Sequence, residues 1–240
     1  MMDSQAFDFG RIGFLISIWA LPVLIAITLH EAAHGFVAWR LGDPTARLLG
    51  RVSFNPLRHI DLFGTILLPA MLLLASGGRL MFGYAKPVPV NFGRLGKPRR
   101  DMVLVAAAGP AINILLLAAS ALLLKALSVV APSADSGSAA EWAIHNLINS
   151  AWINAVLAVF NLLPIPPLDG GRMAVGLLPA GPAHALARME RFGIVLILGA
   201  LLVLPWLGRT VGLDLDLFWW LVGAPAEYLV KSAFALAGVR

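Results

Sequence analysis

Two histidines with a glutamate between them are the most chemically specific feature of the sequence. His30, Glu31 and His34 form an H-E-x-x-H sequence inside a long apolar stretch. In a helix, residues i and i+4 share a face, so both imidazoles can reach one zinc ion while Glu31 accepts a proton from its bound water. The alternative is two histidines packed in a core, but three ionisable groups at membrane depth are costly unless they pair or bind something. The pattern therefore predicts a metal site.

A catalytic zinc site needs a third protein ligand, with water in the fourth position. The chain has no cysteine, so that ligand must be a histidine, an aspartate or a glutamate. Asp169 is the candidate, because it follows a helix that is ended by the prolines of the sequence PIPPLDGG, residues 164–171. Irregular backbone near a membrane is tolerated where it lines a protein cavity. A turn aspartate before two glycines is the other interpretation of the same residues.

The composition places these residues in a membrane protein. Hydrophobic residues make up 59% of the 240 residues and charged residues 13%, against roughly 25% charged in a soluble domain. We predict an all-α polytopic membrane protein, a single domain over residues 1–240, with about five to six transmembrane helices. The first apolar stretch is too long, and its flanks too acidic, for a signal peptide, so we expect it to be retained. The long helices are expected at residues 12–40, 102–130, 143–164, 190–207 and 215–234.

One apolar stretch, residues 62–76, is too short for a full span. Lys and Arg residues, which accumulate on the cytoplasmic side, flank it on both sides. If this stretch enters and leaves by one surface, most of the 18 basic residues lie inside, and Arg11, Lys125 and Arg209 lie outside. We therefore predict a re-entrant or interfacial segment. The net charge of +5 suits loops facing anionic lipid of the bilayer, and no nucleic-acid partner is expected.

Residues 83–92 contain prolines that alternate with valines, which disfavours a helix and predicts an extended or β segment. Such a segment could hold an unwound substrate by strand addition, with the N–H groups of Val88 and Val90 as substrate-binding donors. Asn113 in a later apolar helix predicts either an interhelical hydrogen bond or a substrate-binding group that lines the site.

The ordered set of motifs resembles the site-2 protease family of intramembrane zinc metalloproteases. The set is His30-Glu31-x-x-His34, then Gly109-Pro110-x-x-Asn113, then the run from Asn161 to Gly171. Residues 83–91 resemble the compact prokaryotic branch of that family, which lacks a PDZ domain. The similarity covers about residues 20–175, and the C-terminal helices at about 190–234 carry none of the motifs.

This resemblance implies one Zn²⁺ per chain, bound by His30, His34 and Asp169, with Asn161 beside the metal to stabilise an oxyanion. It implies a metalloendopeptidase that hydrolyses peptide bonds within or next to transmembrane segments of membrane-protein substrates. From an outside start near residue 12, His30 lies about 27 Å along its helix, so the active site is expected toward the cytoplasmic side of a prokaryotic cell membrane. The alternative is a membrane metal-binding or metal-transport protein, and a transporter would show further ligands along a path.

Overall fold

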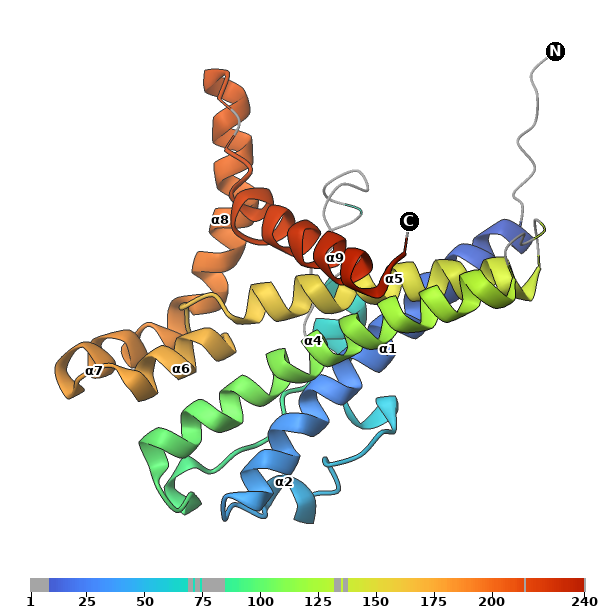
Figure 1. The fold of residues 1–240 in the computed structure, drawn as a ribbon. Coiled ribbons are helices and arrows are strands. Elements are labelled where there is room, and N and C mark those ends of the chain that lie inside the picture. The colour runs from blue at the N-terminus through green and yellow to red at the C-terminus, as the bar shows by residue number, and fades with distance from the viewer. Residues whose placement is uncertain are drawn as a thin grey trace.

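The chain is described by a computed structural model that covers residues 9–68, 71, 74, 85–131, 135, 138–213 and 215–239. Helices make up most of these residues, and no strand occurs among them (Figure 1). The predicted all-α class is therefore confirmed. Most of the later half of the stretch predicted as re-entrant, residues 62–76, lies outside the described residues.

Four of the described helices are long and apolar enough to cross a membrane, which makes the chain a polytopic membrane protein as predicted. The stretch predicted at residues 215–234 is instead one π-helical turn followed by a shorter helix, so the count of five to six spans stays a prediction. The four long helices are α1 (Phe9–Arg40), α4 (Pro98–Val130), α5 (Ala139–Asn161) and α8 (Glu190–Val211), and the C-terminal pair is η4 (Trp219–Gly223) and α9 (Ala224–Ala237).

Local sequence determines where α4 and α5 begin. Pro98 occupies the first turn of α4, where a missing N–H costs nothing, and Asp101 accepts the backbone N–H of Lys97 at 2.7 Å. Ser138 caps α5 by accepting the N–H of Glu141 at 3.1 Å. These starting points contribute to which residues of each helix face α1.

Helices α1, α4 and α5 lie against one another at the centre of the molecule (Figure 1). α1 and α5 run in one direction and α4 runs in the opposite direction. Lipid offers no hydrophobic drive between helices, so close packing of small side chains takes its place. The side chains of one helix can therefore reach the backbone of the next. The fully buried alanines of this centre are Ala26, Ala38, Ala151, Ala155 and Ala158.

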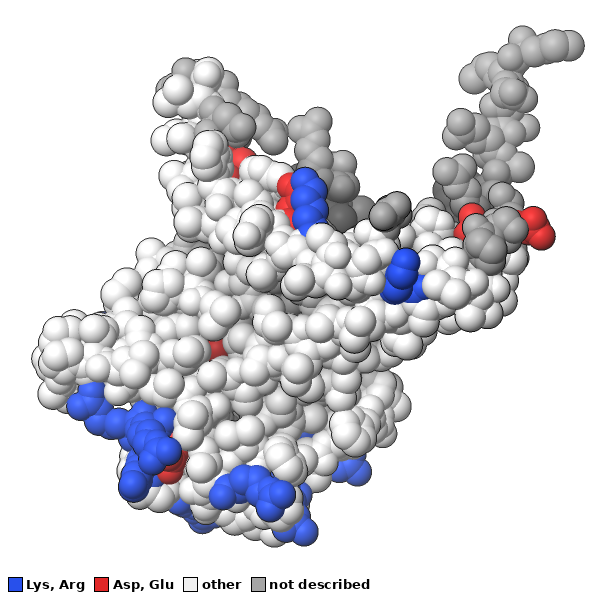
Figure 2. Space-filling model, viewed as in Figure 1, with Lys and Arg blue, Asp and Glu red and all other residues white. Residues whose placement is uncertain are grey.

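The chain between α1 and α4 begins and ends at the same place. Gly96 donates its backbone N–H to the carbonyl of Leu41 at 3.1 Å, and Lys86 donates its backbone N–H to the carbonyl of His59 at 2.9 Å. Lys and Arg side chains gather over this end of the molecule (Figure 2). The short elements of this part are α2 (Thr45–Leu48), η1 (Pro56–Arg58), the π-helical η2 (Leu62–Leu67) and η3 (Phe92–Arg94).

The β segment predicted at residues 83–92 is not confirmed. Its described residues, from position 85 to position 91, form no strand and no helix before η3 begins. Side chains hold this backbone in place instead of a neighbouring strand. The guanidinium group of Arg51 donates to the carbonyl of Lys86 at 2.6 Å, and the Asp43 carboxylate accepts the N–H of Asn91 at 2.6 Å. Proline cannot donate to a ladder, so alternating prolines leave this segment dependent on such contacts.

Candidate metal centre

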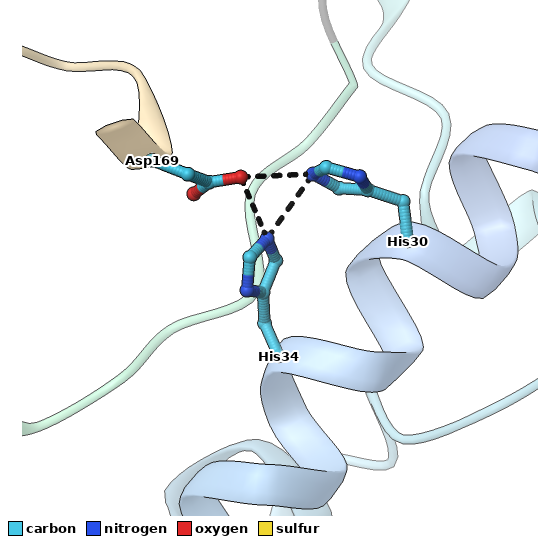
Figure 3. Close-up of side chains that lie close together, drawn as sticks. All are labelled: His30, His34 and Asp169. Carbon is cyan, nitrogen blue, oxygen red and sulfur yellow. Dashed lines mark hydrogen bonds and ion pairs between the residues drawn. The ribbon is translucent and has the colours of Figure 1, made fainter. Parts of the chain in front are cut away.

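His30 and His34 lie one turn apart on α1, and their rings approach the same point (Figure 3). Both side chains are buried, and their Nε2 atoms are 3.1 Å apart. The H-E-x-x-H spacing therefore brings the two imidazoles together on one face of the helix, as expected for positions i and i+4.

Asp169 reaches this point from the first residue of α6 (Asp169–Leu177), which is followed by α7 (Ala180–Arg188). Its Oδ2 atom lies 3.2 Å from Nε2 of His30 and 3.2 Å from Nε2 of His34 (Figure 3). Asp169 is also buried. The three residues that the sequence singled out as metal ligands thus meet in space, although they come from two distant segments.

Two glycines allow α6 to start so close to the end of α5. A Cβ atom on Gly170 would lie 2.2 Å from the carbonyl oxygen of Leu162, and one on Gly171 would lie 2.2 Å from the backbone nitrogen of Pro166. Any other residue would therefore push α6 away from the turn that follows α5. The Asp-Gly-Gly sequence is what lets the carboxylate of Asp169 point back at α1.

The other ring nitrogen of each histidine is held by an oxygen atom of α4. His30 Nδ1 donates to Oδ1 of Asn113 at 2.5 Å, and His34 Nδ1 donates to the carbonyl of Val105 at 2.7 Å. A carbonyl oxygen can only accept, so each Nδ1 carries a proton, and in the neutral ring each Nε2 then keeps a lone pair. Metal-ligating histidines show this pattern, because the second nitrogen donates to an oxygen that fixes the ring.

The three ligand atoms fit a zinc ion. Two lone pairs and a carboxylate oxygen lie within 4.8 Å of one another, where burial makes their mutual repulsion costly unless a cation lies between them. Ligands about 2.0–2.1 Å from a tetrahedral zinc ion are separated by roughly 3.3 Å, and the separations here are 3.1, 3.2 and 3.2 Å. No second group of this kind converges in the described part of the chain, and no path of further ligands is found there.

A glycine of α4 keeps the space beside both rings open. A Cβ atom on Gly109 would lie 2.4 Å from Nε2 of His34 and 2.5 Å from Nε2 of His30. Both distances are far below van der Waals contact, so only glycine fits where α4 passes the ligand atoms.

Glu31 lies beside the ligands and is bonded to the segment that follows η2. Its Oε2 atom accepts the backbone N–H of Val88 at 2.7 Å, and Val88 is itself buried. The contact joins the predicted general base to a predicted substrate-binding residue. No pattern in the sequence indicates this link, because it depends on how residues 85–91 fold back over α1.

A cavity of about 380 Å³ contains the ligands, and Glu31, Val88, Val90 and Asn161 also line it. These four predicted site residues therefore surround one space. Asn161 donates its Nδ2 to the carbonyl of Leu157 at 3.0 Å, which leaves the second hydrogen of the amide for another acceptor.

Asn113 lies elsewhere: it is fully buried, and it does not line the cavity. Its Oδ1 faces His30, and its Nδ2 donates to Oδ1 of Asn154 at 2.7 Å. Of the two roles predicted for Asn113, the interhelical hydrogen bond is the one that the structure shows.

Asn154 is a residue that the sequence analysis does not single out, although a signal was present. The apolar helix α5 contains four asparagines, Asn146, Asn149, Asn154 and Asn161, and three of them recur about every two turns. Polar amides that share one side of a transmembrane helix indicate contacts with other helices, because lipid cannot satisfy them.

Comparison with known proteins places the chain in a class that agrees with this geometry. The chain belongs to Peptidase family M50, the site-2 protease family of intramembrane zinc metalloproteases, whose model matches residues 125–204. It is accordingly a zinc-dependent metalloendopeptidase of the membrane.

Individual relatives carry the same description in their names. The chain is 36% identical over 218 residues to the zinc metalloprotease YwhC of Bacillus subtilis, and the match covers 90% of each chain. It is 34% identical over 179 residues to the zinc metalloprotease Rip2 of Mycobacterium tuberculosis, over 73% of this chain and 62% of the relative. Rip2 of Mycolicibacterium smegmatis is 31% identical over 212 residues, 87% of this chain and 75% of the relative. No solved structure matches the chain.

Proposed function

We propose that His30, His34 and Asp169 hold one Zn²⁺ and that Glu31 is the general base of peptide hydrolysis. The substrate is a membrane protein, cut within or next to a transmembrane helix. The observation that carries this proposal is the convergence of two Nε2 lone pairs and the Asp169 carboxylate in a cavity that Glu31 also lines.

The residues around the ligands have separate roles in the proposed hydrolysis. A zinc ion held by His30, His34 and Asp169 would supply a positive charge that polarises the scissile carbonyl and lowers the pKa of a water molecule toward about 7. Glu31 takes the proton of the attacking water and delivers it to the leaving amine. Val88 already donates to Oε2 of Glu31, so Oε1 is the oxygen that accepts this proton. Asn161 offers its second amide hydrogen to the carbonyl oxygen of the substrate as negative charge develops there.

A helical substrate must unwind before it is cut, because its carbonyls are held in internal hydrogen bonds. In our proposal, residues 85–91 receive the unwound chain by strand addition, since their backbone is in neither a helix nor a strand and several of them line the cavity. The N–H of Val88 is taken by Glu31, so Val90 is the donor to the substrate that this proposal retains.

We further propose that the site lies toward the cytoplasmic side of a prokaryotic cell membrane. The support comes from the Lys and Arg side chains that gather over the end of the molecule with α2 and the start of α4 (Figure 2). His34 precedes Arg40, the last residue of α1, by about 9 Å along the helix. The metal site is therefore close to this basic end.

The test is zinc content and proteolysis of the purified full chain beside its Glu31→Gln variant. Wild type should hold about one zinc ion per chain and cleave members of a panel of membrane-helix substrates. Glu31→Gln should hold the same zinc and lose turnover by roughly 100-fold or more, because the amide cannot accept a proton. Cleavage by the variant at the wild-type rate would contradict the role of Glu31, and a wild-type chain without zinc would contradict the metal assignment.

A further inference from the structure

A chain of buried amides connects His30 to a backbone carbonyl on α5. Asn113 accepts from His30 at 2.5 Å and donates to Asn154 at 2.7 Å. Asn154 in turn donates its Nδ2 to the carbonyl of Ser150 at 2.8 Å. Asn113 is 0% exposed and Asn154 is 1% exposed, so water cannot replace either of them as a partner. The chain therefore crosses three helices, from α1 through α4 to α5.

Each link of this chain has a direction. An asparagine amide has a donor end and an acceptor end of nearly the same shape, so its orientation is set by its partners. If the amide of Asn113 turned over, its NH₂ group would face the N–H of His30, and its oxygen would face the oxygen of Asn154. Asn154 cannot turn over to match, because its oxygen would then face the carbonyl of Ser150. The backbone carbonyl of Ser150 can only accept, so it fixes the direction of the whole chain.

The Asn113 end of this chain of amides determines which nitrogen of His30 is free to bind a metal. With Oδ1 of Asn113 held toward His30, the ring proton stays on Nδ1, and Nε2 presents its lone pair to the site. His34 needs no such chain, because its Nδ1 donates directly to the backbone carbonyl of Val105. The two histidine ligands are therefore held by different means, one by fixed backbone and one by side chains.

We infer that Asn154 is a positioning residue of the zinc site, which holds the Asn113 amide in the direction that keeps the proton on Nδ1 of His30. The inference rests on the proposed role of His30 as a zinc ligand. Asn154 touches neither the ligands nor the cavity. It acts two residues away from the metal, through Asn113.

Another asparagine of α5 provides a matched control. Asn146 lies two turns earlier on α5, is buried, and donates its Nδ2 to the carbonyl four residues before it, Trp142, at 2.9 Å. Asn154 makes the same bond to Ser150 at 2.8 Å. The two asparagines thus share their helix and their local bond, and both are buried. Asn154 differs in its bond to Asn113 and in a 3.3 Å contact of its Nδ2 with Oγ of Ser150.

The experiment measures zinc dissociation constants of the full chain in detergent by competition with a chelator. Asn154→Leu should weaken zinc binding about 10- to 100-fold, the usual effect of removing a partner that holds a ligand. Asn146→Leu should change it by less than about 3-fold, since the Asn146 amide is bonded to Trp142 and not to Asn113. In the double variant, Asn154→Leu should add nothing to Asn113→Leu, because both break one chain. Wild-type affinity in Asn154→Leu, or full additivity with Asn113→Leu, would overturn the inference.

Two further measurements separate positioning from simple destabilisation. Asn154→Asp should restore zinc binding, because a buried neutral carboxyl group can accept from Asn113 and donate to Ser150 as the amide does. This variant also keeps the test decisive if Asn154→Leu does not fold, since weak zinc binding by folded Asn154→Asp contradicts the inference. Ring ¹⁵N shifts of the zinc-free protein should show the His30 proton on Nδ1 in wild type and in Asn146→Leu. In Asn154→Leu they should show a mixture of the two neutral tautomers, with the proton on Nδ1 or on Nε2. If wild type and all variants bind no zinc, the proposed function fails; if all bind it equally, only this inference fails.

Discussion

Glu31 and Val88 are joined by a hydrogen bond of 2.7 Å between a carboxylate oxygen and a backbone N–H. The residues are far apart in the sequence, and the bond brings the segment of residues 85–91 onto the face of α1 that carries the ligands. A carboxylate that accepts from a fixed amide has fewer orientations available, so this bond holds the second oxygen of Glu31 toward the cavity. The segment expected to receive the substrate thus also orients the base.

Replacement of Val88 by proline should lower turnover roughly 10-fold or more, because proline has no N–H to hold Glu31 and a general base contributes at least that much. Zinc content should not change, since no ligand is touched. Val88→Ala keeps the N–H and is the control. The measurement is cleavage of a helical substrate and of a helix-broken version. Equal losses on both substrates indicate that Glu31 is misoriented. A loss confined to the helical substrate would indicate docking at Val88 instead, and wild-type turnover on both would refute the role of Val88 in orienting Glu31.

Replacement of Gly109 by alanine should abolish zinc binding at ordinary metal concentrations. The new Cβ would lie 2.4 Å from Nε2 of His34 and 2.5 Å from Nε2 of His30, so either the rings or α4 must move. Alanine is otherwise favoured over glycine in a helix by roughly 0.5–1 kcal/mol, so α4 itself should not be weakened. Gly13→Ala, on α1, has open space around the added methyl group and serves as the control. Full zinc occupancy in Gly109→Ala would contradict the statement that only glycine fits beside the two rings.

Asp169→Ala should lower zinc affinity by roughly 10-fold or more and reduce proteolysis with it, because it removes one of three protein ligands. Metal analysis after dialysis against a chelator provides the measurement. The expected loss of zinc distinguishes this variant from Glu31→Gln, which should keep its metal. Normal zinc content in Asp169→Ala would mean that another residue completes the site.

The contact between Asp43 and Asn91 should weaken in acid. Burial alone would raise the pKa of the Asp43 carboxyl, but hydrogen bonds from Thr45 and Asn91 outweigh it and hold that pKa below its usual value. A pKa lowered by folding means that the carboxylate stabilises the fold above about pH 4, and that this contribution is lost as the pH falls through the lower value. The protection of the Asn91 amide, its exchange rate relative to the intrinsic rate of an unfolded chain at the same pH, should therefore fall below about pH 4. The same acid sensitivity in Asp43→Asn would exclude Asp43 as its source.

Arg47 and Lys97 should face the same side of the membrane. The bond between Gly96 and Leu41 closes the chain between α1 and α4 at its base, so both residues belong to one end of the molecule. The chain has no native cysteine, which allows single cysteines to be introduced at these positions and labelled from the cytoplasmic side. Labelling from opposite sides would contradict the prediction that residues 62–76 enter and leave by one surface.

The sequence was sufficient to predict which three side chains converge, His30, His34 and Asp169, but not what holds them. The spacing of His30 and His34 dictates their common face, and the family motif adds Asp169. The bond from Glu31 to Val88 depends on how residues 85–91 fold back over α1. The amide chain through Asn154 depends on how separate helices are rotated against one another, which periodicity does not determine. The alternating prolines correctly excluded a helix at residues 85–91, yet a strand also needs a partner strand, and the described residues offer none there.

The proposed ligands come from two helices that are far apart in the sequence, α1 and α6. Zinc that binds all three should therefore also affect the stability of the folded protein. If His30, His34 and Asp169 hold the metal as proposed, zinc gains its third ligand only when α6 is docked and stabilises the docked form by mass action, by about 2.7 kcal/mol when free zinc is 100 times its dissociation constant. Gly170 and Gly171, which allow α6 to pack closely, and the metal would thus both stabilise the docked position of α6. The concentration of available zinc would therefore set how firmly Asp169, at the start of α6, is held against the two histidines of α1.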